Sequence, residues 1–174
     1  MPQARITQVR DALAAFIDAA WDEAVVAEAL PARATADEVI AKYRLDFSLD
    51  SSKPLTFEGR KVCVFVGTYQ GIPADRGEGA NDYTLTVWVL ELYRDPAALP
   101  GAPQGAPPDE WLDERLYFAE WLWKRAGNPR TVELLGSLWP QEVGEVVALD
   151  PDRLAEQKLF ISQFTITFRE HAAP

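Results

Sequence analysis

The chain has 174 residues, of which 48% are hydrophobic and 25% charged, a composition typical of a folded protein and not of a disordered one. Its 17 basic and 27 acidic residues give a formal net charge of −10, and the basic residues are scattered singly, which argues against tight binding to DNA or RNA and against attraction to anionic membranes. The length suits a single domain over residues 1–174, with about 70% of the extended chain's surface buried on folding.

The number of cysteines and the lack of long apolar runs indicate the cellular compartment in which we expect the protein. Cys63 is the single cysteine, so an intramolecular disulfide is impossible and a cytosolic origin is the natural interpretation. It stands in an apolar strand pattern, which favours an inert buried thiol. The first residues lack the apolar core of a signal peptide, and no stretch approaches the roughly 20 apolar residues that span a bilayer.

The first predicted elements are a helix and a strand. Apolar residues recur at spacings of three and four, which predicts one stripe of an amphipathic helix that ends before Pro31. From residue 39 to 49 the period changes to two, which predicts a half-buried strand. The residues of the helical stripe are Ile6, Val9, Leu13, Phe16, Ile17, Ala20, Trp21 and Ala24.

Two further strands are predicted around a long loop. KVCVFVGTY, residues 61–69, is almost continuously apolar and is typical of an inner strand covered on both faces. Residues 71–82 are rich in glycine and charge and predict a loop, and loops of this length tend to be functional. DYTLTVWVLELY, residues 82–93, returns to strand alternation.

Beyond these strands, residues 95–108 contain five prolines and predict an extended connector that cannot join a sheet centrally. A second helix is expected from Asp109 up to the stop at Gly127-Asn128-Pro129. VGEVVAL, residues 143–149, indicates a short strand. Asp150 and Pro151 then predict the cap and first residue of a short helix through Gln157.

The chain closes on KLFISQFTITFRE, residues 158–170, which has the clearest strand alternation. Phe160, Ser162, Phe164, Ile166 and Phe168 share one face of that strand. We therefore expect the last strand to be an integral part of a sheet. Together the elements predict an α+β fold with a mainly antiparallel sheet of about five strands and the N-terminal and central helices packed on one face.

No catalytic, cofactor-binding or metal constellation emerges from the residues. His171 is the single histidine and lies near the chain end, so neither a common zinc site nor a histidine-activated nucleophile can be assembled without it. Asp150, Asp152 and Glu156 lack the EF-hand pattern and are better explained by helix capping. Four tryptophans favour core packing, with a partner interface or a sugar-stacking platform as alternatives: Trp111, Trp121, Trp123 and Trp139.

Taken in order, these elements resemble the tail terminator and tail-completion proteins of long-tailed bacteriophages. The likeness is carried by ITQVRDALAAFI, by the strand pair VCVFVGTY and YTLTVWVLELY with its long loop, and by the ending ALDPDRLAEQKLFISQFTITFRE. In that family a short Asp-Pro turn, a few helical residues and a closing strand of the form F-S-x-hydrophobic-Thr-hydrophobic-Thr-aromatic-Arg are common. The connector at 95–108 departs from the family, being longer than so small a fold requires.

The resemblance implies a non-enzymatic structural protein of the virion tail or neck, assembled in the host cytoplasm, without cofactor or membrane. It implies a homo-oligomeric ring, a hexamer, that caps the tail tube protein and meets the head-tail connector protein while DNA passes through the lumen without specific binding. An acidic protein suits such a conduit, since a basic lumen would hold the phosphates. The expected interface lies in the 69–82 segment: Tyr69, Gln70, Arg76, Glu78 and Asp82.

Two other classes stay open from the residues alone. An acidic host-directed binding module or inhibitor would occupy a basic groove on its partner, and its one-to-one complex would depend strongly on salt. A small carboxylate-dependent hydrolase would need two acids held close together in a cleft, and the spacing of the acids singles out no pair.

Overall fold

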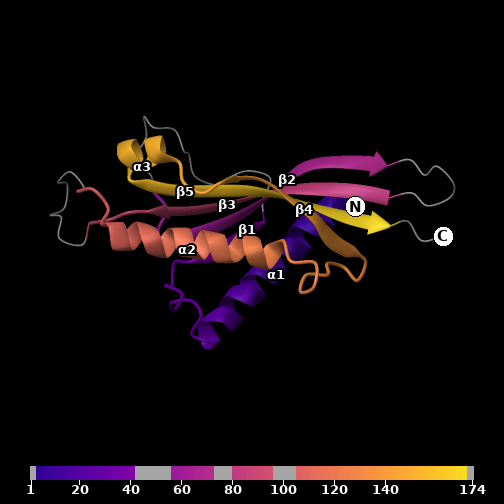
Figure 1. The fold of residues 1–174 in the computed structure, drawn as a ribbon, viewed down its shortest axis with the longest axis horizontal. Coiled ribbons are helices and arrows are strands. Elements are labelled where there is room, and N and C mark those ends of the chain that lie inside the picture. Colours follow the sequence, from indigo (N-terminus) through magenta and orange to yellow (C-terminus); the bar gives the residue numbers. More distant parts are fainter. Residues whose placement is uncertain (1–2, 42–55, 73–79, 96–104, 172–174) are drawn as a thin grey trace.

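The structure is a computed structural model that describes residues 3–41, 56–72, 80–95 and 105–171. Figure 1 shows a central sheet with two long helices on one side and a short helix on the other. The elements in chain order are α1 (Arg5–Val26), β1 (Glu38–Ala41), β2 (Arg60–Ile72), β3 (Ala80–Leu92), α2 (Asp109–Ala126), β4 (Leu138–Val147), α3 (Pro151–Gln157) and β5 (Leu159–His171).

The five strands lie in the order β1-β2-β3-β5-β4. The short β1 runs parallel to β2, and the other three pairings are antiparallel. The predicted α+β class with a mainly antiparallel sheet is therefore confirmed. The last strand of the chain lies between β3 and β4, so the C-terminal segment is an interior part of the sheet, as its alternation predicted.

One face of the sheet forms the main core with the two long helices. Trp21 of α1 and Phe118 of α2 contact each other with ring centroids 4.6 Å apart, and both are almost fully buried. Removing apolar side chains from water in this way is the main source of folding free energy. The sheet side chains in this core come from alternate positions of three strands: Val62, Val64, Tyr83, Leu85, Val87, Val89, Phe160, Phe164, Ile166 and Phe168.

The opposite face carries a second, smaller core near α3. Cys63, Leu90 and Leu159 are completely buried there, together with Phe57 and Ile161. Since Val62 and Val64 are buried on the helix side while Cys63 is buried on the other, the first part of β2 is covered on both faces, as its apolar run predicted. Further along the strand the prediction is wrong, because Gly67 and Thr68 are exposed. The thiol of Cys63 is buried, as expected.

The helix ends follow from local sequence. Asp150 caps α3, since its carboxylate accepts a hydrogen bond from the Arg153 amide at 3.0 Å, and Pro151 is the first helical residue. α2 begins with acidic and ends with basic residues, which complements the helix dipole, and Gly127 caps it. Both helices have the bounds that the sequence predicted.

Three boundaries differ from expectation. The predicted 71–82 loop is shorter, because β2 runs to Ile72 and β3 starts at Ala80. β4 begins at Leu138 and not at Val143, and its register shifts at two points. Of the strand predicted over 39–49 only the start is described, in β1; the rest lies outside the described residues, as do residues 96–104 of the connector.

Candidate interface at the hairpin end of the sheet

The structure describes three of the five sequence-predicted site residues, at the paired ends of β2 and β3. Tyr69 and Gln70 belong to β2, where their backbones pair with Tyr83 and Asp82 of β3. Arg76 and Glu78 lie outside the described residues. Three of the five predicted residues thus belong to strands, and the assignment of Asp82 to a loop is wrong, because the antiparallel ladder continues past it.

Asp82 forms a two-pronged ion pair with Arg169 of β5, its partner in the register. Arg169 donates from Nε to Oδ1 at 2.7 Å and from Nη2 to Oδ2 at 2.8 Å. The paired carboxylate raises the pKa of the Arg169 guanidinium. Asp82 is therefore paired within the chain, so a partner would meet an ion pair there and not a lone acid.

Next to this pair, Glu170 joins three segments of the chain. Its carboxylate forms an ion pair with Arg5 of α1 and accepts hydrogen bonds from the Tyr83 hydroxyl at 3.0 Å and the Ser137 hydroxyl at 3.1 Å. The Arg5 hydrogen bond is the main reason that the pKa of Glu170 is lowered, and Glu170 in turn raises the pKa of Arg5. This cluster ties the start of α1 and the turn before β4 to the end of β5.

The sheet face opposite the helices is rich in threonine towards this end. Thr84 and Thr167 are paired across β3 and β5, with their hydroxyl oxygens 2.9 Å apart, and Thr86 faces Thr165. All four side chains are partly exposed. This part of the face therefore presents small, uncharged hydroxyl groups.

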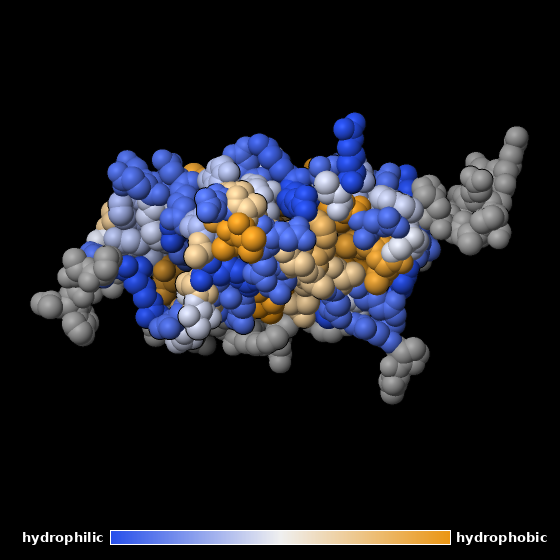
Figure 2. Space-filling view, turned by 90° about the horizontal axis from the view of Figure 1, so that it is seen from below, coloured by the Kyte–Doolittle hydropathy of each residue, from blue (hydrophilic) through white to orange (hydrophobic). Residues whose placement is uncertain are grey.

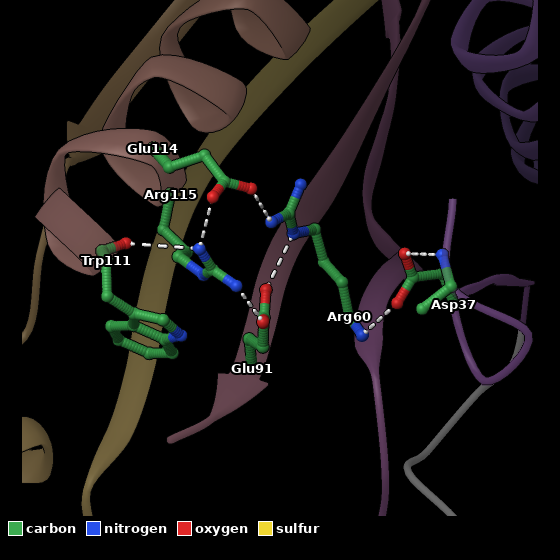
Figure 3. Close-up of polar contacts among 7 residues, drawn as sticks. Asp37, Arg60, Glu91, Trp111, Glu114 and Arg115 are labelled. Atoms are coloured by element: carbon green, nitrogen blue, oxygen red, sulfur yellow. Dashed lines mark hydrogen bonds and ion pairs between the residues drawn. The ribbon is translucent and has the colours of Figure 1, made fainter. Parts of the chain in front are cut away.

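A second polar cluster lies at the other end of β3 and joins α2 to the sheet (Figure 3). Glu91 accepts from Arg60 Nε at 2.8 Å and from Arg115 Nη2 at 2.5 Å, and Glu114 bridges the same two arginines at 3.3 and 2.8 Å. The arginine side chains are 7% and 12% exposed. Four charges of alternating sign thus form a closed, largely buried ring.

Aromatic rings support both guanidinium groups of this charge ring. The Arg60 guanidinium carbon lies 4.4 Å from the centroid of Phe118, and that of Arg115 lies 4.5 Å from the centroid of Trp111. Arg115 Nε is buried without a hydrogen-bond partner. Glu91 and Glu114 each pair with both arginines, so this cluster fixes α2 on the sheet.

An apolar hollow opens between the middle of α2 and the end of β4. Its volume is about 180 Å³, and its wall includes Trp123 of α2, Val146 of β4 and Phe164 of β5. Of the four tryptophans singled out in the sequence, Trp111, Trp121 and Trp123 pack partly against the main core, while Trp139 is 37% exposed. Core packing accounts for three of them.

The described residues offer little to metal or membrane chemistry. Within them, no group of three or more histidine, cysteine, aspartate or glutamate side chains is arranged to hold a metal ion. Neither α1 nor any other helix in the described ranges combines the length and apolar character needed to cross a bilayer.

Comparison with models of known protein families finds no match, and no curated protein sequence matches the chain. The interpretation of the hairpin end therefore depends on its own chemistry. The interactions described there are ion pairs within the chain, Asp82 with Arg169 and Glu170 with Arg5, on strands β3 and β5 and the start of α1.

Sequence reasoning missed Arg169, Glu170 and Arg5, which lie about the same strand ends. Charge alone did not identify these residues as part of the candidate site, because the pairing of Asp82 with Arg169 depends on the register of β3 against β5. The available signal was the alternation of β5, which places Arg169 on the same face as Thr167.

Proposed function

We propose that the protein is a non-enzymatic structural subunit of a phage or phage-derived particle, a tail terminator that forms a ring on the tail tube and meets the head-tail connector. The observation that carries the proposal is the interior position of β5, which makes the C-terminal segment part of a rigid five-strand sheet. Together with the resemblance of the closing sequence, a sheet whose strand ends are held by internal ion pairs suits repeated packing around an axis.

The threonine-rich face supports a role as a conduit for DNA. Thr84, Thr86, Thr165 and Thr167 bear no charge, and Arg169 beside them is neutralised by Asp82. A lumen lined in this way would not hold DNA, because ion pairs between DNA phosphates and lysine or arginine side chains supply most of the non-specific affinity. We assign this face to the lumen of the proposed ring.

Electron microscopy and native mass spectrometry of the purified protein, alone and mixed with tube and connector subunits, test the proposal. We expect a closed ring, with six copies as the expected number, that binds the end of the tube. Arg76→Glu should impair assembly and leave the thermal unfolding transition unchanged. A protein that stays monomeric in every mixture would rule out the tail terminator.

The acidic binding module is the second candidate, and it is favoured by the exposed acids along α1. Asp18 and Asp22, which both pair with Arg33, and Glu23, which pairs with Arg125, have side chains that are 52%, 64% and 73% exposed. A module of this kind would bind one basic partner, and its affinity should fall steeply between low and physiological salt. A salt-insensitive complex of many copies would contradict it.

A further inference from the structure

A basic side chain, that of Arg169, belongs to the threonine-rich face near the hairpin end of the sheet. Arg169 shares this face with Thr165 and Thr167, because every second residue of a strand points to the same side. Its side chain is 33% exposed, and that of its partner Asp82 is 16% exposed. The short helix α3 lies on this side of the sheet but over the opposite end (Figure 1). The guanidinium group therefore reaches the surface of this face.

The carboxylate of Asp82 occupies one edge of that guanidinium group. Arg169 donates from Nε and Nη2, at 2.7 and 2.8 Å, to the two oxygens of the same carboxylate. A phosphate group presents two oxygens to an arginine in the same parallel arrangement. Asp82 and a DNA phosphate would therefore compete for the same donors of Arg169.

Two hydroxyl groups lie one step along the same face. Thr84 follows Asp82 on β3, Thr167 precedes Arg169 on β5, and the two hydroxyl oxygens are 2.9 Å apart. Arginine and threonine side chains are among the usual partners of DNA phosphates. Without the charge of Asp82, this part of the face would present a guanidinium group and two hydroxyls, a set suited to binding phosphate.

The surrounding charge is negative. Glu142 of β4 is the register partner of Thr167 and is exposed, and the chain has a formal net charge of −10. Such a field repels phosphates at a distance, whereas a direct contact with a guanidinium group attracts them. The pairing of Arg169 with Asp82 therefore decides whether this end of the face can hold DNA.

We infer that Asp82 is an internal competitor for DNA phosphates: its carboxylate holds the phosphate-binding edge of Arg169 and so keeps the threonine-rich face from retaining double-stranded DNA. This inference rests on the proposed function, in which that face lines the lumen. It gives Asp82 a role inside the ring and not at a contact between subunits. In a ring the pair would recur in every copy, so loss of the carboxylate would add one phosphate contact per copy.

Asp82→Asn tests the inference, because it removes the charge and keeps the size of the side chain. Binding of a short labelled DNA duplex is measured by fluorescence anisotropy at about 50 and 200 mM salt. We expect D82N to bind the duplex about tenfold more tightly than wild type at the lower salt concentration, and to lose this gain at the higher one.

Three further variants accompany D82N, and thermal unfolding shows that each is folded. Asp113→Asn is the matched control, since it makes the same change in net charge at an exposed position of α2, on the helix-bearing side that Figure 2 views. Hydrophilic residues surround separate apolar patches on that side, and D113N should bind DNA as weakly as wild type. The double variant D82N/R169Q should lose the gain with the cation. Asp82→Thr, which introduces a residue favoured in strands, removes the carboxylate in a second way and should reproduce the gain.

The outcomes separate this inference from the proposed function. Equal DNA affinities of D82N and D113N, or a gain that persists in D82N/R169Q, would overturn the competitor role of Asp82 and leave the tail terminator intact. Native mass spectrometry of the wild type decides the ring independently of DNA. A protein that stays monomeric with tube and connector subunits would overturn the proposed function, whatever the affinity of D82N for DNA.

Discussion

At the scale of single residues, Glu170 links the stability of the fold to pH. Its pKa is lowered in the folded state, first by the Arg5 hydrogen bond, so its contribution is fully present above the unfolded-state pKa and is lost as the pH falls through the folded-state pKa. We expect Glu170→Gln to cost about 1–3 kcal/mol at neutral pH, because Arg5, Tyr83 and Ser137 lose an ionised acceptor.

Urea unfolding measured from neutral pH to below pH ~4 checks this expectation. The difference in unfolding free energy between wild type and Glu170→Gln should shrink as the pH falls. Glu156→Gln, an exposed glutamate of α3, serves as the matched control and should track wild type. A constant difference at every pH would show that the charge of Glu170 is not what holds this cluster.

Glu91 is the residue on which the buried charge ring depends. Glu91→Gln would leave Arg60 and Arg115 buried beside a neutral amide, so we expect a loss of about 3–5 kcal/mol in unfolding free energy. Glu58→Gln is the matched control, since Glu58 pairs with Arg94 at 3.1 Å on the surface with both side chains more than half exposed, and such pairs contribute about 0–1 kcal/mol. Equal losses in the two variants would contradict a special role for the ring.

At the scale of elements, two glycines allow the cost of a left-handed backbone to be distinguished from the cost of a steric clash. Gly59 precedes β2 and Gly136 precedes β4, and both have φ of +70°. A Cβ at Gly59 would lie 2.5 Å from the Ala36 backbone, whereas nothing lies within 4 Å of one at Gly136. We expect Gly136→Ala to cost about 1–2 kcal/mol from the left-handed backbone alone, and Gly59→Ala to cost more in urea unfolding. Similar costs would show that the approach of Ala36 adjusts without strain.

The helices and the central strands were predictable because their signals are local. The stripe of α1, the Gly127 stop of α2, the Asp150 cap of α3 and the alternation of β5 each lie within a few residues of sequence. These elements agree in type with expectation, and the bounds of α2 and α3 agree as well, whereas α1 ends at Val26, before the predicted stop at Pro31.

The features that escaped prediction depend on contacts far apart in the sequence. β4 begins five residues before the predicted Val143, because β5 pairs with Leu138 and Pro140, residues that carry no clear strand alternation of their own. In the same way, the ion pair of Asp82 with Arg169 spans 87 positions, and only the strand register brings these side chains together. The sequence could therefore draw attention to Asp82 but not to the ion pairs that surround it.

At the scale of the whole molecule, the C-terminal strand should be essential for folding. A chain that ends at Lys158 loses Phe160, Phe164, Ile166 and Phe168 from the main core, about 1.5–3 kcal/mol each, and leaves β3 and β4 without the strand between them. We expect no cooperative thermal unfolding transition. A chain that ends at His171 keeps all of β5 and should unfold like the full protein; cooperative unfolding of the shorter chain would refute an interior role for β5.

The edge strand β4 is poorly suited to pairing with a strand of another molecule. Pro140 provides no amide hydrogen, and the ladder of β4 against β5 is interrupted after Pro140 and after Gly144. A strand from another molecule would therefore find a broken row of hydrogen-bonding groups along this margin. These interruptions disfavour edge-to-edge aggregation through β4, so in the proposed ring a contact at this edge would be made by side chains.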